Sequence, residues 1–363
     1  MKVGILGGGQ LGRMLALAGY PLGLTFRCLD PAPDAPAGQL AELLVGDYGD
    51  ASALARFAAG LDAVTYEFEN VPVAAARRLA ERLPLHPSVA ALETAQDRLA
   101  EKTLFQRLDI PTAPFVAVDD RAGLDAAVAR LGLPAVLKTR RFGYDGKGQV
   151  VLRVPGDTVA AWDVLGAQAL ILEPFVEFRR EVSVLGVAGR DGEARFYPLV
   201  ENTHRDGILR TSLAPAPGAA PGPQALAEAH ATRILAELGY VGVLAIEFFE
   251  VEGRLLANEM APRVHNSGHW TIEGAETSQF ENHLRAVLGL PLGGTAARGT
   301  SLMLNLVGTV PDTAAVLAVP GAHLHLYGKE PRAGRKLGHI TVRVDSAEEL
   351  ARARERLVAV DEI

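Results

Sequence analysis

The chain has 363 residues, of which 48% are hydrophobic and 22% charged, the composition of an ordinary globular protein with two or three domains. Its net charge of −7 argues against general attraction to nucleic acid or to an anionic membrane. A single cysteine, Cys28, excludes an internal disulfide and a cysteine-based zinc site. Without a signal-peptide pattern or a long apolar run, we expect a cytoplasmic protein that binds neither nucleic acid nor membranes.

The amino-terminal stretch predicts a strand at residues 2–6, a Gly-Gly-Gly-Gln-Leu-Gly turn at 7–12 and a helix to about residue 20. A G-x-G-x-x-G turn between a strand and a helix is typical of dinucleotide-binding proteins. A second predicted strand, 24–29, ends at Asp30, where such proteins place a ribose-binding acid. A nicotinamide-dependent dehydrogenase is therefore one hypothesis. The alternative is that this fold needs the tight turn whatever it binds.

A strand at 63–68, a helix at 73–82 and a short strand near 85–86 continue this pattern. We therefore predict a small doubly wound α/β domain over residues 1–93. Glu67 and Glu69 lie at a predicted carboxyl end of a strand, where α/β proteins usually bind ligands. Either residue could contact a substrate or cap the next helix.

The middle of the chain carries a basic, glycine-rich loop behind a short strand. The strand at 135–139 contains Lys138 between apolar neighbours, and Arg-Arg-Phe-Gly-Tyr-Asp-Gly-Lys-Gly-Gln follows at 140–149. Backbone amides and Lys147 suit triphosphate oxygens, and Lys138 should point into a cleft that holds an anion. A solvated surface loop is the alternative.

Further along, Glu-Pro-Phe-Val at 173–176 predicts a strand that runs into a bend, which can offer backbone groups and a carboxylate to an adenine and a ribose. Glu181 could hold the ribose hydroxyls. The segment 204–210 is expected to be a polar loop.

Two apolar segments, 241–250 and 254–258, predict a β-hairpin that brings Glu247 opposite Asn258 and Glu259. Two carboxylates at such a short distance repel each other unless a cation lies between them. Because both offer oxygen ligands, the cation they favour is Mg²⁺. The alternative is a pair of solvated glutamates. Against it stands the following loop, which is rich in hydrogen-bonding side chains: Arg263, His265, Asn266, Ser267 and His269.

The last part predicts strands at 301–306, 323–327 and 339–344 and a closing helix at 347–358. Between the last two strands lies a basic loop, 329–336. This loop is either a solvated turn or a clamp for a substrate phosphate.

Taken in order, these motifs resemble an ATP-grasp ligase. The turn at 7–12, Gly-Tyr-Asp-Gly-Lys-Gly-Gln at 143–149, Asp-Gly-Ile-Leu-Arg-Thr-Ser at 206–212 and Asn-Glu-Met-Ala-Pro-Arg-Val-His-Asn-Ser-Gly-His-Trp at 258–270 are similar to the 5-(carboxyamino)imidazole ribonucleotide synthases. The resemblance implies an α/β protein with an amino-terminal domain at 1–93, an ATP-grasp domain of two α+β subdomains at 94–290 and a small α/β domain at 291–363. It also implies a homodimer.

The resemblance further implies residue roles. Mg²⁺, or Mn²⁺, would bind Glu247 and Glu259. Catalysis would involve Lys147, Arg263, His265 and Asn266. ATP would contact Arg98, Lys138, Gly143, Tyr144, Asp145, Gly146, Lys147, Gly148, Gln149, Glu173, Pro174, Phe175, Val176, Glu181, His204, Asn258 and Glu259. The substrate, 5-aminoimidazole ribonucleotide with bicarbonate, would contact Gln10, Leu11, Tyr144, Asp145, Arg263, His265, Asn266, Ser267, Lys329 and Arg335.

Three alternatives stay open at this point. The first is a sister ATP-grasp ligase such as a formate-dependent glycinamide ribonucleotide transformylase. The second is the dehydrogenase. The third is a catalytically silent ATP-binding regulator, which the intact carboxylate pair disfavours.

Overall fold

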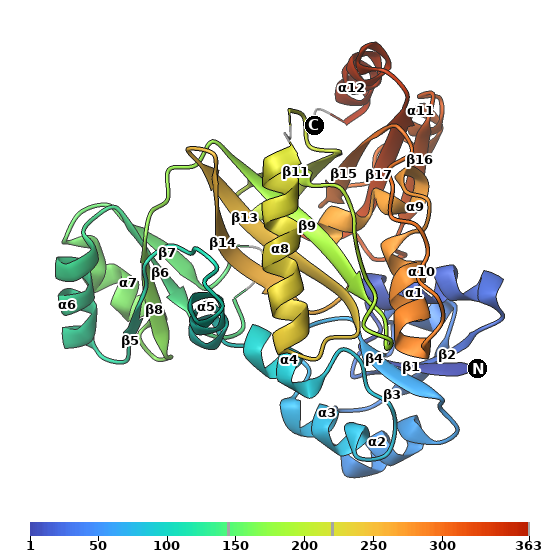
Figure 1. The fold of residues 1–363 in the computed structure, drawn as a ribbon, viewed down its shortest axis with the longest axis horizontal. Coiled ribbons are helices and arrows are strands. Elements are labelled where there is room, and N and C mark those ends of the chain that lie inside the picture. The colour runs from blue at the N-terminus through green and yellow to red at the C-terminus, as the bar shows by residue number, and fades with distance from the viewer. Residues whose placement is uncertain (144–145, 219–220, 362–363) are drawn as a thin grey trace.

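The computed structural model describes residues 1–143, 146–218 and 221–361 and contains three sheets (Figure 1). The amino-terminal sheet is parallel, in the order β3-β2-β1-β4. Its elements are β1 (Lys2–Leu6), α1 (Gln10–Gly19), β2 (Thr25–Asp30), β3 (Glu42–Val45), α2 (Ala51–Ala58), β4 (Ala63–Tyr66) and α3 (Val73–Ala80). The sequence predicted all of these except β3 and α2. The edge strand β3 is largely solvent-accessible, so it lacks the apolar alternation that marks a strand.

A second, antiparallel sheet forms a separate unit, drawn in green on the left of Figure 1. It has the order β5-β8-β6-β7 and packs against two helices around its own apolar core. Its elements are β5 (Val116–Val118), α6 (Arg121–Leu131), β6 (Ala135–Thr139), β7 (Gln149–Leu152), α7 (Asp157–Leu165) and β8 (Leu170–Pro174). Before it in the chain come α4 (Val89–Ala95) and α5 (Arg98–Arg107).

The central sheet has nine strands in the order β14-β13-β9-β11-β12-β15-β17-β16, with β10 paired to β9. The strands are β9 (Arg180–Ala188), β10 (Ala194–Phe196), β11 (Val200–Arg205), β12 (Ile208–Ala214), β13 (Gly242–Val251), β14 (Arg254–Ala261), β15 (Thr300–Val307), β16 (Ala322–Leu326) and β17 (Lys336–Val344). The accompanying helices are α8 (Pro221–Glu237), α9 (Thr271–Gly274), α10 (Gln279–Leu288), α11 (Thr313–Leu317) and α12 (Ala347–Asp361). Because β12 pairs with β15, the carboxyl-terminal strands extend the central sheet, which the sequence did not predict.

The expectation of a polar loop at 204–210 was wrong. This segment contains the end of β11, a tight turn at Asp206 and Gly207, and the start of β12. Asp206 (φ 54°) and Gly207 (φ 74°) form the turn in the left-handed region, and Asp-Gly is a strong signal for such a hairpin.

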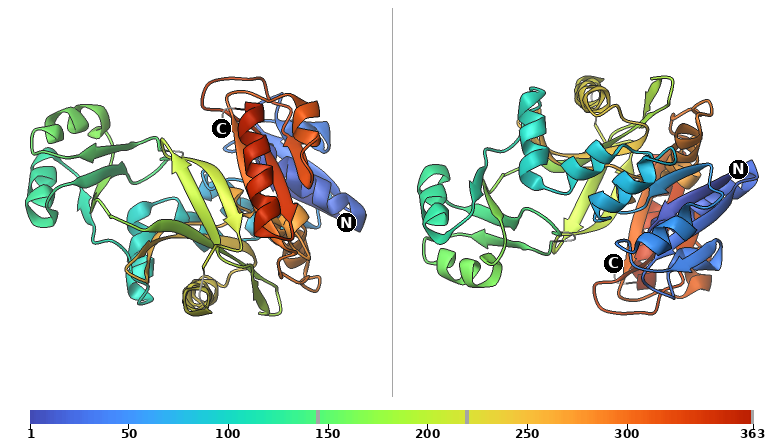
Figure 2. Two further views of the ribbon diagram at one scale, coloured as in Figure 1. Left: turned by 90° about the horizontal axis from the view of Figure 1, so that it is seen from above. Right: turned by 90° about the horizontal axis from the view of Figure 1, so that it is seen from below.

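Two helices cover opposite faces of the central sheet. Helix α8 packs on β9 in one apolar core, while α10 packs on β9 and β13 in another. The second core also contains Leu15 of α1, so α10 joins the amino-terminal unit to the central sheet. Both views of Figure 2 show the amino-terminal and carboxyl-terminal parts side by side, away from the green unit. Within the described ranges, no helix has the length and apolar character needed to cross a bilayer.

Replacing Leu244 by Ala tests the core beneath α8. Leu244 on β13 is fully buried in that core, so its truncation should lower the free energy of unfolding by about 2–5 kcal/mol. Urea-induced unfolding measures this change. The control is Leu226→Ala on α8, where the side chain is 37% exposed and the change should stay within about 0.5 kcal/mol. Equal losses in the two variants would contradict the packing described.

Candidate active site

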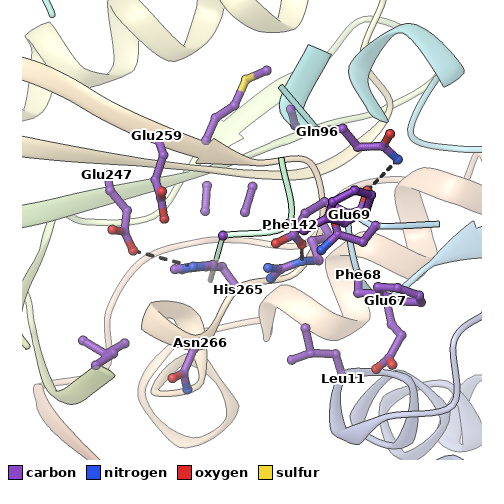
Figure 3. A pocket seen from close by; sticks show the side chains of 18 of the residues that line it. Leu11, Glu67, Phe68, Glu69, Gln96, Phe142, Glu247, Glu259, His265 and Asn266 are labelled. Atoms are coloured by element: carbon purple, nitrogen blue, oxygen red, sulfur yellow. Dashed lines mark hydrogen bonds and ion pairs between the residues drawn. The ribbon is translucent and has the colours of Figure 1, made fainter. Parts of the chain in front are cut away.

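A cavity of about 420 Å³ lies where the three units meet, and Figure 3 shows the side chains that point into it. Many of the residues predicted from sequence line this cavity: Gln10, Leu11, Arg98, Gly143, His204, Glu247, Glu259, Arg263, His265 and Asn266. They come from segments as distant in sequence as α1, α5 and the loop after β14, and the fold brings them together.

Glu247 and Glu259 face each other across the β13–β14 pair, as the hairpin predicted. They are direct register partners, next to a bulge between Glu247 and Phe248. Directly opposed residues in an antiparallel pair have Cβ atoms about 5 Å apart. Arg98 Nη1 donates to Glu259 Oε2 at 2.8 Å, and His265 Nε2 lies 3.6 Å from Glu247 Oε1.

The pKa values of the two carboxyls reflect this crowding. Burial, and then the charge of Glu259, raise the pKa of Glu247. Burial also acts to raise the pKa of Glu259, but the charge and hydrogen bond of Arg98 outweigh it and lower that pKa. One cation, Arg98, therefore stabilises only one carboxylate of the pair.

This pair fits a hard divalent ion that receives its other ligands from substrate. In the described part of the chain, no group of three or more His, Cys, Asp and Glu side chains is arranged to hold a metal. Two carboxylates that share one cavity wall match the usual Mg²⁺ arrangement, in which phosphate oxygens and water complete the shell.

Lys138 was expected to point into a cleft that holds an anion, but it does not line the cavity, and its anionic partner belongs to the protein. Lys138 Nζ and Lys102 Nζ each lie 3.2 Å from Glu173 Oε2, and all three side chains are buried. Glu173 Oε1 is also buried and has no hydrogen-bond partner among the described residues. Two lysines on one carboxylate leave an excess of positive charge together with an unused acceptor. That arrangement suits an anionic ligand with a hydrogen-bond donor.

The glycine-rich loop folds tightly where it is described, and Tyr144 and Asp145 lie outside the described residues. Gly146 (φ 75°) and Gly148 (φ 73°) occupy the left-handed region. A Cβ at Gly146 would meet the carbonyl oxygen of Asp206 at 2.8 Å, so this position requires glycine. The loop therefore abuts the β11–β12 turn, with Gly143 at the cavity wall and Lys147 exposed.

The other predicted nucleotide residues include Phe175 just after β8, Glu181 on β9, His204 on β11 and Asn258 on β14. His204 pairs with Glu181; burial opposes protonation, but this hydrogen bond raises the pKa of His204. Phe175 is exposed, and Asn258 Oδ1 is buried without a partner among the described residues. The residues of this set that do not line the cavity are Lys138, Gly146, Lys147, Gly148, Gln149, Glu173, Pro174, Phe175, Val176, Glu181 and Asn258.

The loop after β14 holds its polar side chains in fixed positions. Arg263 forms an ion pair with Glu69, and Asn266 exchanges two hydrogen bonds with Asn305. Burial, and then the charge of Arg263, lower the pKa of His265 to about 3. Ser267 does not fit its predicted substrate contact, because it is fully buried and does not line the cavity.

The glycine-rich turn at 7–12 is already occupied by carboxylates of the protein. Asp30 accepts from the Gly8 amide at 2.7 Å, and Glu67 accepts from Gly9 and Gly12 at 2.6 and 2.8 Å. A dinucleotide pyrophosphate would need these same amides and would be repelled by both carboxylates. The turn is therefore evidence against the dehydrogenase. Glu67 binds amides at the start of α1, which precedes it in the chain, and not the next helix as one of the two expectations had it.

The basic loop before β17 reaches the cavity at its edge. Lys329 Nζ donates to Gln10 Oε1, and Tyr327 and Lys336 line the cavity. Arg335 lies outside the lining, and its Nη1 donates to the carbonyl of Glu330 at 3.1 Å.

Sequence reasoning missed several lining residues: Phe68, Gln96, Glu101, Arg140, Leu209, Tyr327 and Lys336. Lys336 was recognisable as the end of the basic run. Glu101, which accepts from the Met260 amide at 2.6 Å, had no signal, because its position in a helix resembles that of any surface glutamate.

Comparison with known proteins agrees with this architecture. Family models match at residues 1–96 (ribonucleotide synthetase preATP-grasp domain), 103–280 (ATP-grasp domain) and 301–353 (phosphoribosylaminoimidazole carboxylase C-terminal domain). A curated relative, N5-carboxyaminoimidazole ribonucleotide synthase of Pseudomonas aeruginosa, is 59% identical over 343 residues, which cover 94% of each chain.

Solved structures are similar over the whole chain. N5-carboxyaminoimidazole ribonucleotide synthetase of Thermus thermophilus has a TM-score of 0.96 and 63% identity over 99% of both chains. The Aspergillus clavatus enzyme, in complex with ADP and 5-aminoimidazole ribonucleotide, has a TM-score of 0.93 and 33% identity over 100% of this chain and 99% of that one. The chain belongs to the N5-carboxyaminoimidazole ribonucleotide synthase family of ATP-grasp ligases.

Proposed function

We propose that the chain uses ATP and bicarbonate to carboxylate the amine of 5-aminoimidazole ribonucleotide. The products are 5-(carboxyamino)imidazole ribonucleotide, ADP and phosphate, in purine biosynthesis. The observation that carries this proposal is the Glu247–Glu259 pair in a cavity that also presents Arg98, Arg263 and His265. The relative solved with ADP and the aminoimidazole ribonucleotide supports the choice of substrates.

In this proposal the nucleotide lies between the green unit and the β13–β14 pair. Lys138, Lys147 and Arg98 contact its phosphates, while Glu173 and Glu181 contact the base and the ribose. Mg²⁺, or Mn²⁺, held by the carboxylate pair supplies charge neutralisation when ATP is bound.

Chemistry follows in two steps. An oxygen of bicarbonate accepts the γ-phosphoryl group, which gives carboxyphosphate. The amine then attacks the carboxyl carbon of carboxyphosphate, or of CO₂ released from it. The N–C bond forms, the C–O bond to phosphate breaks during or before this attack, and the amine proton passes to the phosphate. Arg263 stabilises the anionic intermediate, and Asn266 orients the substrate. Water would destroy carboxyphosphate, so the site has to exclude water during the transfer.

An assay of ADP release tests this function. With 5-aminoimidazole ribonucleotide present, release should depend on bicarbonate, because bicarbonate is the phosphoryl acceptor. Formate with glycinamide ribonucleotide should give no release above background. Release that responds to formate and not to bicarbonate would assign the chain to the sister ligase instead.

Glu259→Gln tests the metal role. The amide is similar in shape but removes one of the two negative charges, so bicarbonate-dependent ADP release should fall by at least about 100-fold, as expected when a charged ligand contact worth about 3 kcal/mol is lost. The control is Glu252→Gln at the exposed hairpin turn, which should keep wild-type turnover. Near-normal turnover in Glu259→Gln would refute the assignment.

Lys329→Ala tests the ribonucleotide phosphate site. Loss of a charged hydrogen bond should raise the KM for the ribonucleotide about tenfold or more, while the KM for ATP stays within about twofold. Arg335→Ala should have the same effect, because Arg335 is proposed to bind the same phosphate. Arg332→Ala, an exposed cation in the same loop, is the control. Equal effects of Lys329→Ala on both substrates would count against the phosphate role.

The homodimer is proposed on the family resemblance alone, and the cytoplasmic location on the expectation from the sequence. Sedimentation of the purified chain tests the first, and fractionation of cells that express it tests the second.

A further inference from the structure

The ring of His265 is held from one side by Ser267. The backbone amide of Ser267 donates to His265 Nδ1 at 3.3 Å, and Ser267 Oγ lies 2.9 Å from the same nitrogen. A backbone N–H can only donate. Nδ1 therefore acts as an acceptor, which disfavours the Nδ1–H tautomer and the doubly protonated ring, with the amide contact the longer and weaker of the two. The Ser267 hydroxyl must then donate to Nδ1 as well.

A buried chain of hydrogen bonds runs in the same direction. Because the Ser267 hydroxyl donates to the ring, its oxygen accepts from Ser183 Oγ at 2.8 Å. Ser183 Oγ in turn accepts from Asn202 Nδ2 at 2.9 Å, and Asn202 Oδ1 accepts from Ser212 Oγ at 2.7 Å. The chain crosses three neighbouring strands, β9, β11 and β12, and ends at the cavity.

The members of this chain are well suited to hold a direction. Ser183, Ser212 and Ser267 are fully buried and Asn202 is 5% exposed, so bulk water does not compete for their hydrogen bonds. Reversing one bond would leave a buried donor facing a donor, which is costly. Gln279 fixes the backbone beside the ring: its Oε1 accepts from the His265 amide at 2.9 Å and its Nε2 donates to the His265 carbonyl at 2.6 Å.

We propose that this chain of hydrogen bonds fixes His265 as the neutral Nε2–H tautomer, so that the residue acts in the cavity only as a hydrogen-bond donor. With its proton on Nε2, the ring can neither accept a proton from the amine nor ligate a metal through that nitrogen. Resting on the proposed function, the acceptor is an oxygen of bicarbonate or of the carboxyl group in transfer. Ser267, Ser183, Asn202 and Ser212 are positioning residues.

Nitrogen NMR of the full chain, labelled with ¹⁵N-histidine, tests the tautomer directly without substrate. The difference spectrum against His265→Gln identifies the His265 signals. We expect Nδ1 at the shift of an unprotonated ring nitrogen and Nε2 coupled to a proton. A protonated Nδ1 would overturn the proposal, whatever the activity of the enzyme.

Substitutions of His265 test the donor role. Glutamine offers a neutral N–H donor and cannot act as a base at neutral pH, whereas leucine offers no donor. His265→Gln should therefore keep kcat within about tenfold of wild type, while His265→Leu should lose at least about 100-fold, as for removal of one donor to a developing oxyanion. Equal losses in both variants would contradict a donor role.

Ser183→Ala tests the chain at a distance, because Ser183 does not line the cavity. Without Ser183, the Ser267 hydroxyl is no longer forced to donate to the ring. A protonated Nδ1 population should appear in the NMR spectrum, and kcat should fall about three- to tenfold with an unchanged KM for ATP.

The matched control is Ser301→Ala, a fully buried serine on β15 of the same sheet whose hydroxyl has no partner among the described residues. It should change neither the spectrum nor kcat. If Ser183→Ala and Ser301→Ala give the same NMR spectrum and the same kcat, the chain of hydrogen bonds does not set the tautomer of His265. Absence of bicarbonate-dependent turnover in the wild type would instead refute the proposed function and leave the NMR result standing.

Discussion

Two carboxylates, Glu247 and Glu259, face each other across the β13–β14 pair. Their mutual repulsion is the constraint on which the account of the site depends. They are register partners beside a bulge, and Arg98 forms an ion pair with Glu259. Such a pair is costly in an enclosed site unless a further cation joins it. The fold keeps the pair at the meeting point of its three units, where a nucleotide with its metal ion would supply the missing charge.

The sheet explains how residues so distant in sequence meet there. Because β12 pairs with β15, one continuous sheet contains both β13 and β14, which carry the carboxylate pair, and β16 and β17, which the basic loop connects. Helix α10 packs the amino-terminal unit against that sheet, which brings Gln10 within hydrogen-bond distance of Lys329. Buried side chains on β9, β11 and β12 also form hydrogen bonds with one another, and through Ser267 these connect to the ring of His265.

Local patterns in the sequence were sufficient to predict much of this. Alternation predicted β6 at its observed bounds, and the hairpin signal predicted that Glu247 lies opposite Asn258 and Glu259, of which Glu259 is the observed partner. Ordered motifs predicted the ATP-grasp fold, which the comparisons confirmed. The residue roles and the domain boundaries stay predictions.

What the sequence could not predict depends on tertiary contacts. Ser267 resembled a substrate-binding residue because it lies in a polar loop, yet the fold turns it under His265 and buries it. Glu67 capping α1 and the shared Lys102–Glu173–Lys138 cluster involve partners at least 35 residues apart. Pairing at such separations leaves no periodic trace in the chain.

The most direct test of the central claim is a crystal structure of this chain with ADP and Mg²⁺. Our account predicts a metal ion bound by one or more oxygens of both Glu247 and Glu259 and bridged to the phosphates, with the nucleotide between the green unit and the β13–β14 pair. A structure in which both carboxylates turn away from the metal, or in which the phosphates bind elsewhere, would contradict it.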